Sequence, residues 1–314
     1  RFNCRKSAIK NGEWILKKTQ CLSSEKNVKR REKAAIVNEL RQKYPLKDLL
    51  QLSGLARSTF YYYIQHPIKD KYKKEKQEIL YIFLANKGRY GYRRILIVLR
   101  QKGYTINHKT VLKLMKKLNL KGKQRKNSKY RSYKGEIGKI ADNLLNREFT
   151  ATKPFEKLAT DVTEFKVCND KVYLSPVMDL YNREIVSYSI SLSPNLQQIR
   201  EMLDGLFKKL PANAKPLFHS DQGWQYQHSE YQRLLSEHNI VQSMSRKGNC
   251  MDNGAMENFF GRLKVEMFYG EKFESVKAFI DELKRYIDYY NNERISLKLK
   301  GMSPVQYRTH SQAS

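Results

Sequence analysis

The sequence predicts an all-α front part with helix-turn-helix units, followed by an α/β domain in which helices flank a mixed sheet. Strand-like runs follow one another after about residue 152 and then alternate with helix-like runs, the pattern of a sheet layered by helices. The front part instead has apolar residues at helical spacing. Charge divides the chain at the same place, because residues 1–150 hold 39 Lys and Arg against 11 Asp and Glu, whereas residues 151–314 hold 22 against 20. A surplus confined to one part favours a polyanionic partner such as double-stranded DNA.

Residues 28–66 are predicted to form a helix-turn-helix domain, after a basic and weakly patterned segment over residues 1–27. Its last two helices are expected over Leu46–Leu52 and Arg57–Ile64, with a glycine-containing turn between them. A short turn of this kind between compact helices is typical of the motif, whose second helix enters the major groove. A plain three-helix bundle explains the same pattern. Under the DNA-binding interpretation, the residues that face DNA are Arg57, Ser58 and Thr59.

A second helical domain is predicted over residues 67–121, with helices near Glu75–Ala85, Tyr92–Gln101 and Asn107–Leu118. The third helix has two cations in its first turn, after the capping residue Asn107, although the N-terminus of a helix favours anions. Cations in that position indicate a phosphate partner, and the inference extends more weakly to the start of the second helix. The DNA-contacting residues predicted for this domain are Arg93, Arg94, His108, Lys109 and Lys113.

The stretch over residues 122–150 is predicted to be a basic linker that lies along DNA. Residues 121–139 hold eight cations and one acid, a composition that does not bury a core. The four cysteines form no Cys-x-x-Cys pair, which indicates a reducing compartment and argues against a structural zinc site. No apolar run approaches the ~18 residues that a membrane span needs, so we expect no membrane partner.

The rear part is predicted to hold a catalytic domain over residues 151–268 and a helical extension over residues 269–314. Three strands are expected first, and helices then alternate with strands up to the helix that carries Glu257. The strands are expected over Leu158–Phe165, Val172–Leu180, Glu184–Leu192, Leu217–His219 and Ile240–Ser245. The other helices are expected over Gln197–Leu210, Glu230–His238 and Val276–Asn291.

Three acidic residues in this part have the surroundings of a two-metal site. Asp161 lies in a β-branched, apolar run, Asp221 lies where a short strand breaks into a loop, and Glu257 lies on a helix. Two strand-borne carboxylates and one helix-borne carboxylate can hold a pair of Mg²⁺ ions roughly 3.5–4 Å apart, and oxygen ligands suit this ion. We therefore predict that Asp161, Asp221 and Glu257 are catalytic and bind two Mg²⁺ ions, for which Mn²⁺ can substitute.

The helix that carries Glu257 is predicted to present two further residues on the same face. Lys264 follows by seven residues, which brings it to within about 20° of the same direction and about 10 Å along the helix. Asn253 precedes Glu257 by four residues. We predict that both residues contact DNA beside the scissile phosphate. The alternative for Lys264 is a surface ion pair with Glu266 or Glu271.

Other acids and one rival chemistry are less favoured. Glu164 is three residues from Asp161 and so faces the other side of a strand, Asp179 lies near the sheet, and Asp252 is expected to cap the helix. A covalent tyrosine recombinase would use a His-x-x-Arg element, and none of the six His has Arg three residues on. A DNA-binding regulator with an inactive core stays open as the second hypothesis.

Several motifs resemble one known family. Asp161-Val-Thr-Glu-Phe165, His219-Ser-Asp-Gln-Gly223 and Asn253-x-x-x-Glu257-Asn-Phe-Phe resemble the integrase-type core of bacterial insertion-sequence transposases, most of all the second-reading-frame protein of the IS-three family. Residues 87–94 and 107–115 are similar to its upstream helical domain, so the resemblance covers nearly the whole chain. It implies an RNase H-like core, an Asp-Asp-Glu triad at the three acids above, and Lys264 as the basic residue seven beyond the Glu. Leu158 stands where the family often has Trp, which we ascribe to core packing.

The resemblance also implies an activity and its partners. The protein is expected to bind the terminal inverted repeats of an insertion sequence, to cleave so that 3′-OH ends are freed, and to join them to target DNA through a branched and then circular element. It is expected to act as a homo-oligomer on DNA in the bacterial cytoplasm, associated with the nucleoid. The first residue is Arg, and family members are usually made by frameshifting, so we expect a further helix-turn-helix and a multimerising helix upstream.

Overall fold

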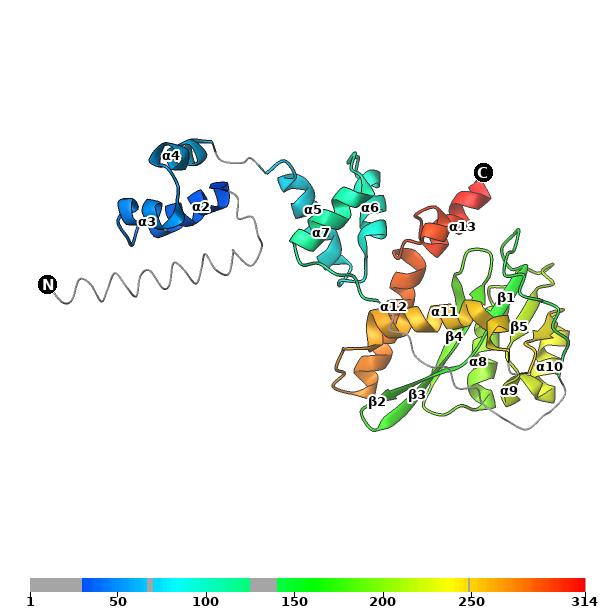
Figure 1. Ribbon diagram of the computed structural model, residues 1–314. Coiled ribbons are helices and arrows are strands. Elements are labelled where there is room, and N and C mark those ends of the chain that lie inside the picture. Colours follow the sequence, from blue (N-terminus) through cyan, green and yellow to red (C-terminus); the bar gives the residue numbers. More distant parts are fainter. Residues whose placement is uncertain (1–29, 67–69, 125–139, 248, 314) are drawn as a thin grey trace. The chain divides into compact units, whose positions relative to one another are not determined.

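The computed structural model describes residues 30–66, 70–124, 140–247 and 249–313. The chain divides into two compact units between Lys73 and Lys74 (Figure 1). The basic segment predicted over residues 1–27 and most of the predicted linker lie outside the described residues. No helix in the part that the structure describes is long and apolar enough to cross a bilayer.

The first unit contains the three helices predicted between residues 28 and 66. They are Arg30–Leu40 (α2), Leu46–Ser53 (α3) and Arg57–Gln65 (α4). Gly54 ends α3 in the left-handed conformation, with φ of 66°, which glycine adopts without a side-chain clash. Phe60 is fully buried in the small apolar core between the helices. The predicted helices and the turn between the last two are therefore confirmed.

The second unit begins with the second predicted set of helices. They are Lys73–Ala85 (α5), Tyr92–Gln101 (α6) and His108–Lys117 (α7). Ile95, Leu99 and Val111 are fully buried and form the core of this set. Asn107 caps α7 as predicted, because its side-chain oxygen accepts the N–H of Lys109 at 2.8 Å.

A mixed sheet lies at the centre of the second unit, as predicted, and it has six strands among the described residues where five were expected. The long strand β3 is antiparallel to β1, β2 and β4, whereas β1, β5 and β6 run parallel to one another. The strands are Lys157–Thr160 (β1), Thr163–Val167 (β2), Asp170–Asp179 (β3), Ile185–Ser191 (β4), Leu217–Ser220 (β5) and Val241–Met244 (β6).

The single strand predicted over Leu158–Phe165 was wrong, because the structure has two strands there with Asp161 in the gap. The register against β3 continues across the gap, from Thr160 paired with Val177 to Thr163 paired with Leu174. The interruption therefore falls opposite Pro176, which has no N–H to donate to a ladder. The break leaves Asp161 at the end of β1 and no longer inside a strand.

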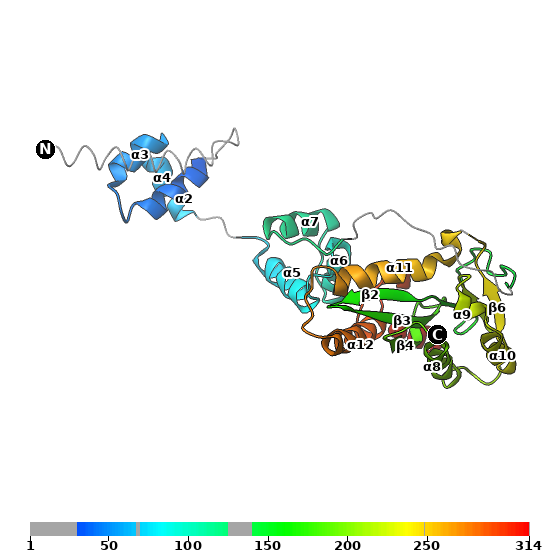
Figure 2. The ribbon, with the colours of Figure 1, turned by 90° about the horizontal axis from the view of Figure 1, so that it is seen from below.

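Helices cover both faces of the sheet. Leu158 and Ala159 point to opposite faces, as neighbours in a strand do, and they belong to different apolar cores. The Leu158 core contains side chains of α8 and α10, and the Ala159 core contains side chains of α11 and α12. Figure 2 shows α8 and α11 on opposite sides of the sheet.

The α-helices of this domain are Leu196–Phe207 (α8), Trp224–Gln227 (α9), Ser229–Glu237 (α10), Gly254–Leu263 (α11), Val276–Asn292 (α12) and Pro304–Ala313 (α13). Two 3₁₀ segments, Cys250–Asn253 (η1) and Leu297–Leu299 (η3), and a π-helical segment, Lys264–Phe268 (η2), lie between them.

Two segments expected outside the catalytic domain pack into its core. Leu145, within the predicted linker, is buried, and its N–H bonds to the hydroxyl of Ser243 on β6 at 3.2 Å. Phe279 and Leu283 of α12, within the predicted helical extension, are fully buried against the sheet. The packed domain therefore includes residues 140–150 and α12. Helix α13 was not anticipated from the sequence.

Candidate active site

The two aspartates lie side by side because of the strand register. β1 and β5 are parallel and pair Leu158 with Phe218 and Ala159 with His219. Continued for two residues, that register brings Asp161 beside Asp221, each directly after its strand. The carboxyl ends of adjacent parallel strands are where ligands bind in open α/β sheets. The N–H of Val162 donates to the Oδ1 atom of Asp161 at 2.8 Å, and that of Gly223 donates to the Oδ1 atom of Asp221 at 2.9 Å.

A buried side-chain hydrogen bond holds the start of the helix that carries Glu257 against the strand that precedes Asp161. The Nδ2 atom of Asn253 donates to the main-chain carbonyl of Thr160 at 3.0 Å, which fixes the beginning of α11 against the end of β1. Glu257 lies in the first turn of α11 and is half-buried. The Oδ1 atom of Asn253 is buried and has no hydrogen-bond partner among the described residues. An oxygen acceptor is therefore held free beside the acids.

Burial and the repulsion between neighbouring carboxylates disfavour the ionised forms of the two aspartates. Burial, the negative charge of Asp221 and, more weakly, that of Glu257 raise the pKa of Asp161 well above its usual range, against the opposing effects of the Val162 N–H and Lys264. Burial likewise raises the pKa of Asp221. A cation bound between the acids would relieve both effects, since an opposite charge nearby favours the ionised form.

The donor atoms suit a hard divalent cation, although they do not enclose one. Within the described ranges, no three His, Cys, Asp or Glu side chains lie close enough together to surround an ion. Mg²⁺ is usually held by only one or two carboxylates, with waters and substrate phosphates as its other ligands. The neighbouring carboxylates of Asp161 and Asp221 fit that requirement, with Glu257 close enough to affect the pKa of Asp161.

Lys264 lies close enough to Asp161 for its charge to lower the pKa of that acid. α11 ends at Leu263, and Lys264 begins a π-helical segment. The Nζ atom of Lys264 lies 5.3 Å from the centre of the Phe165 ring. Burial lowers the pKa of its ammonium group, while Glu164 and Asp161 oppose that change. The alternative of an ion pair with Glu266 or Glu271 is not supported, because those acids bind Arg294 and Lys123.

Two of the acids set aside from the sequence have structural positions. The expectation that Asp252 caps the helix was wrong: its buried carboxylate accepts from Arg147 at 2.7 Å and from Arg246 at 3.0 Å. These bonds join the segment before β1, the loop after β6 and η1, and they hold the pKa of Asp252 well below its usual range, chiefly through Arg246. Glu164 is exposed and pairs with Lys171 at 3.2 Å.

Two buried residues behind the acids were not identified from the sequence as parts of the site. His219 lies between the hydroxyls of Ser243 and Ser245, at 2.9 and 3.1 Å, and burial lowers its pKa to about 4. Its ring therefore supports the end of β5 as a neutral group. Tyr226 is fully buried, and its hydroxyl lies 3.5 Å from the Oγ1 atom of Thr160. His219 precedes Asp221 by two residues in the same short motif. That proximity was the only feature of the sequence that could have indicated that His219 lies near the site.

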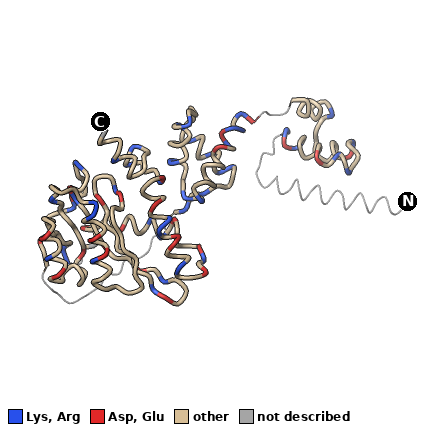
Figure 3. The backbone as a smooth tube through the Cα atoms, turned by 180° about the vertical axis from the view of Figure 1, so that it is seen from behind, with Lys and Arg blue, Asp and Glu red and all other residues tan. Residues whose placement is uncertain are grey.

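The predicted DNA-contacting residues differ in exposure. In the first unit, Arg57 and Ser58 are exposed at the start of α4, and Thr59 is half-buried. In the second unit, α6 and α7 contain basic but no acidic residues (Figure 3). The exposed candidates there are Arg93, His108, Lys109 and Lys113. Asn253, predicted to contact DNA, is instead largely buried.

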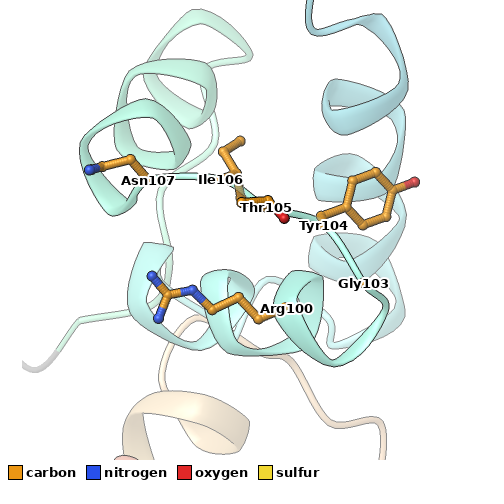
Figure 4. Close-up of a pocket in the computed structure, with 6 residues that line it drawn as sticks. All are labelled: Arg100, Gly103, Tyr104, Thr105, Ile106 and Asn107. Carbon is orange, nitrogen blue, oxygen red and sulfur yellow. The ribbon is translucent and has the colours of Figure 1, made fainter.

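Arg94 does not match its predicted role. Its guanidinium lies 3.3 Å from the carboxylate of Glu266 and 5.3 Å from the Tyr90 ring, so it points into the protein and away from solvent. A separate hollow lies at the turn between α6 and α7, where Figure 4 shows the guanidinium of Arg100 extending to the same side as Asn107. No acid lines this hollow.

Family models match the helices α5 to α7 and the sheet domain of the second unit separately. An HTH-like domain matches residues 69–128, and two models of the integrase core domain match residues 151–250 and 257–311. The second of these covers α12, in agreement with its packing in the core. Together these matches support the RNase H-like architecture of the sheet and its helices.

Relatives of known description extend over nearly the whole chain. A transposase of Escherichia coli K12, InsK of insertion sequence element IS150, is 52% identical over 277 residues, which is 88% of this chain and 98% of that protein. InsF, the transposase of insertion sequence IS3A in the same bacterium, is 30% identical over 90% of this chain and all of its own length. Among solved structures, a chain of the simian T-cell lymphotropic virus intasome gives a TM-score of 0.43 at 15% identity, over 72% of this chain and 73% of that chain.

Proposed function

This chain belongs to the insertion-sequence transposases of the IS3 family, which are DNA transposases with an integrase core, and from that premise we propose how its residues act. We propose that Asp161, Asp221 and Glu257 form the catalytic triad and bind two Mg²⁺ ions, which Mn²⁺ can replace. The substrates are the terminal inverted repeats of the element and its target DNA, and the protein acts on them as a homo-oligomer.

One observation supports this proposal above the others. The parallel register of β1 and β5 brings Asp161 and Asp221 together at the carboxyl ends of two strands. The pKa of Asp161 responds to the charges of both other acids. Asp161 and Asp221 thus share one partly buried site, and the charge of Glu257, from a distant part of the sequence, acts on Asp161 as well.

The chemistry is two in-line phosphoryl transfers. In the first, a water oxygen forms a bond to the scissile phosphorus at the element end, and the bond to the 3′ oxygen breaks, which leaves a 3′-OH and a 5′-phosphate. In the second, that 3′-OH forms a bond to a phosphorus in target DNA, and another 3′ oxygen leaves with the proton. When bound, the cations stabilise negative charge on the attacking and leaving oxygens.

The residues of the chain bind, orient and shield the reacting groups. The ammonium group of Lys264 lies on the side of the site where Phe165 is, and there it can bind a phosphate beside the scissile one. Asn253 holds the start of α11 against the end of β1 through its hydrogen bond to the Thr160 carbonyl. Tyr226 and His219 close the back of the site and hold the strand ends in place.

Three substitutions in the full-length protein test the proposal. The substrate is a duplex with the terminal repeat that flanks the coding sequence, incubated with Mg²⁺. Asp161→Asn, Asp221→Asn and Glu257→Gln should each abolish cleavage and strand joining while end binding persists, since phosphate contacts come from the basic helices. Asp204→Asn, an exposed change on α8, should cleave like the wild type.

Two outcomes would overturn parts of the proposal. Near wild-type cleavage by any of the three variants removes that residue from the triad. A wild-type protein that binds the ends but neither cleaves nor joins them would be a DNA-binding regulator with an inactive core.

A further inference from the structure

Glu266 is a buried acid that joins the catalytic helix to the rest of the second unit. It lies in η2, two residues after Lys264, and is 5% exposed. Its carboxylate accepts from the guanidinium of Arg294 at 2.7 and 2.8 Å and from the hydroxyl of Tyr286 at 3.0 Å. These two partners lie on and just after α12. Together they bond both oxygens of the carboxylate from inside the catalytic domain.

Glu266 is also bonded by residues of the helical region upstream of the catalytic domain. Arg94, in the first turn of α6, donates to the Oε1 atom of Glu266 at 3.3 Å. The main-chain carbonyl of Glu266 accepts from the Nε atom of Arg89 and from the Nζ atom of Lys123, both at 3.3 Å. Residues before α6 and after α7 therefore meet at one residue of η2. That residue stands at the end of the helix that begins beside Glu257.

The backbone at this point is π-helical, and such segments often occur at functional sites. The N–H of Tyr269 bonds to the carbonyl of Lys264 at 2.7 Å, five residues back, as a π-helical turn requires. Lys264 is the first residue of this segment and keeps α-helical torsion angles, with φ of −59° and ψ of −40°. Contacts that hold Glu266 thereby also fix the segment on which Lys264 lies.

We propose that Arg94 is a positioning residue for the chemical step: through Glu266 it sets the placement of η2, and with it Lys264 and Glu257. The inference rests on the proposed function of the triad. It gives the α5–α7 helices a second role. DNA bound on their exposed side would then be connected to the catalytic helix through the Arg94–Glu266 contact. Arg93, the neighbour of Arg94, is exposed and contacts only the Tyr92 hydroxyl and ring among the described residues, so the two arginines of this turn serve different surfaces.

Arg94 can be replaced without exposing a buried charge. Its side chain is 20% exposed, whereas that of Arg294 is 2% exposed and keeps Glu266 paired when Arg94 is absent. Glu266 itself is a poor target, since its removal would leave Arg294 buried without a partner. Lys87 supplies the matched control, because it also joins the upstream helices to α12, through Glu282 at 2.9 Å, but does not touch Glu266.

The test compares full-length Arg94→Gln, Arg94→Lys and Lys87→Gln with the wild type. Three quantities are measured: the affinity for the terminal-repeat duplex, the single-turnover cleavage rate at saturating protein with Mg²⁺, and amide hydrogen exchange over residues 254–268 without DNA. We expect Arg94→Gln to keep the affinity, to lose at least about 10-fold in rate, as misplacement of about 1 Å can cost more than that, and to exchange faster in this segment alone. Arg94→Lys keeps the charge and should recover most of the rate, while Lys87→Gln should match the wild type.

Three results would overturn the inference. Weaker DNA binding by Arg94→Gln with an unchanged rate at saturation would make Arg94 a phosphate contact. An unchanged rate and unchanged exchange would mean that Arg94 positions nothing. Faster exchange throughout the chain would show a general effect on folding. Asp161→Asn, assayed alongside, separates the two proposals: if it is inactive while Arg94→Gln is normal, only this inference falls, and if it still cleaves, the triad assignment falls.

Discussion

The side-chain amide of Asn253 donates a hydrogen bond to the main-chain carbonyl of Thr160, and both residues are buried. Thr160 is the last residue of β1 and precedes Asp161, whereas Asn253 immediately precedes α11, four residues before Glu257. One hydrogen bond thus connects a strand-borne acid of the site to the helix-borne acid. The two bonded residues are 93 residues apart in the sequence, so this hydrogen bond forms only when the chain is folded.

We predict that Asn253→Ala lowers both stability and cleavage. The change leaves the buried Thr160 carbonyl without its donor, which costs about 1–3 kcal/mol, and it frees the start of α11, so cleavage should fall by about 10-fold or more. Thermal unfolding and single-turnover cleavage of the terminal-repeat duplex measure the two effects.

Asn182 provides the control for that prediction. It is fully buried, and its Nδ2 atom donates to the carbonyl of Pro304 at 3.0 Å and to the carboxylate of Glu184 at 2.8 Å, none of which belongs to the proposed triad. Asn182→Ala should lower the melting temperature by a similar amount while the folded protein cleaves normally. Equal cleavage by the two variants would mean that the Asn253 bond is structural only.

Local patterns predicted the helices well, and they predicted that Asp161 and Asp221 lie within or at the ends of strands and Glu257 on a helix. The apolar spacing of Tyr92–Gln101 and the glycine after α3 fixed elements whose bounds the structure repeats. Two failures have a common cause. The strand break at Asp161 falls opposite Pro176 of a partner strand, and the carboxylate of Asp252 binds arginines of other segments instead of capping its helix. Both depend on pairings that no local rule contains.

The same limit applies to the basic residues. Arg93 and Arg94 are equivalent in sequence, and only the fold shows that Arg94 meets Glu266, 172 residues away. The resemblance of the motifs implied the same three acids that the local patterns had indicated. It did not indicate that α12 completes the core or that His219 is held neutral behind Asp221.

Lys264→Glu is expected to lower strand joining by about 10-fold or more, because it puts a fourth acid near Asp161 and removes the cation that would hold the attacking end. Cleavage and joining are measured separately, the latter with a duplex that already carries a free 3′-OH. Lys166→Glu makes the same charge reversal on an exposed position of β2 and should join strands normally. Equal effects of the two variants would reduce the role of Lys264 to its contribution to net charge.

Asp179 makes stability depend on pH. Its carboxylate is buried, accepts the N–H groups of Phe155 and Tyr181 at 2.9 Å, and has its pKa raised from 3.8 to about 6 by burial. Because the folded state keeps the proton longer than the unfolded state, stability from this group is fully present below pH 3.8 and is lost as the pH rises through about 6. The stability of the wild type relative to Asp179→Asn should therefore fall by about 1 kcal/mol between about pH 5 and about pH 7.5. Urea denaturation at a series of pH values measures it, and a difference that does not change with pH would contradict the assignment.

The last prediction concerns α7 as the DNA-binding surface of the second unit. Lys109, Lys113 and Lys116 are exposed at spacings of four and three residues, which places them on one side of the helix, opposite the buried Val111 and Leu114. Each phosphate contact adds about −0.9 to the slope of log affinity against log salt, so replacing all three lysines by Gln should reduce the slope by up to about 2.7.

The intact chain is required for this measurement, because cutting near residue 140 would separate Arg94 and Lys123 from Glu266. The control replaces three exposed lysines of the C-terminal region by Gln, namely Lys277, Lys284 and Lys298. Both triple variants change the net charge equally, so only a local contact can separate them. Fluorescence anisotropy with the terminal-repeat duplex over a series of KCl concentrations gives the slopes. If the two variants have the same slope, DNA is bound through the overall charge of the protein and α7 has no special part in it.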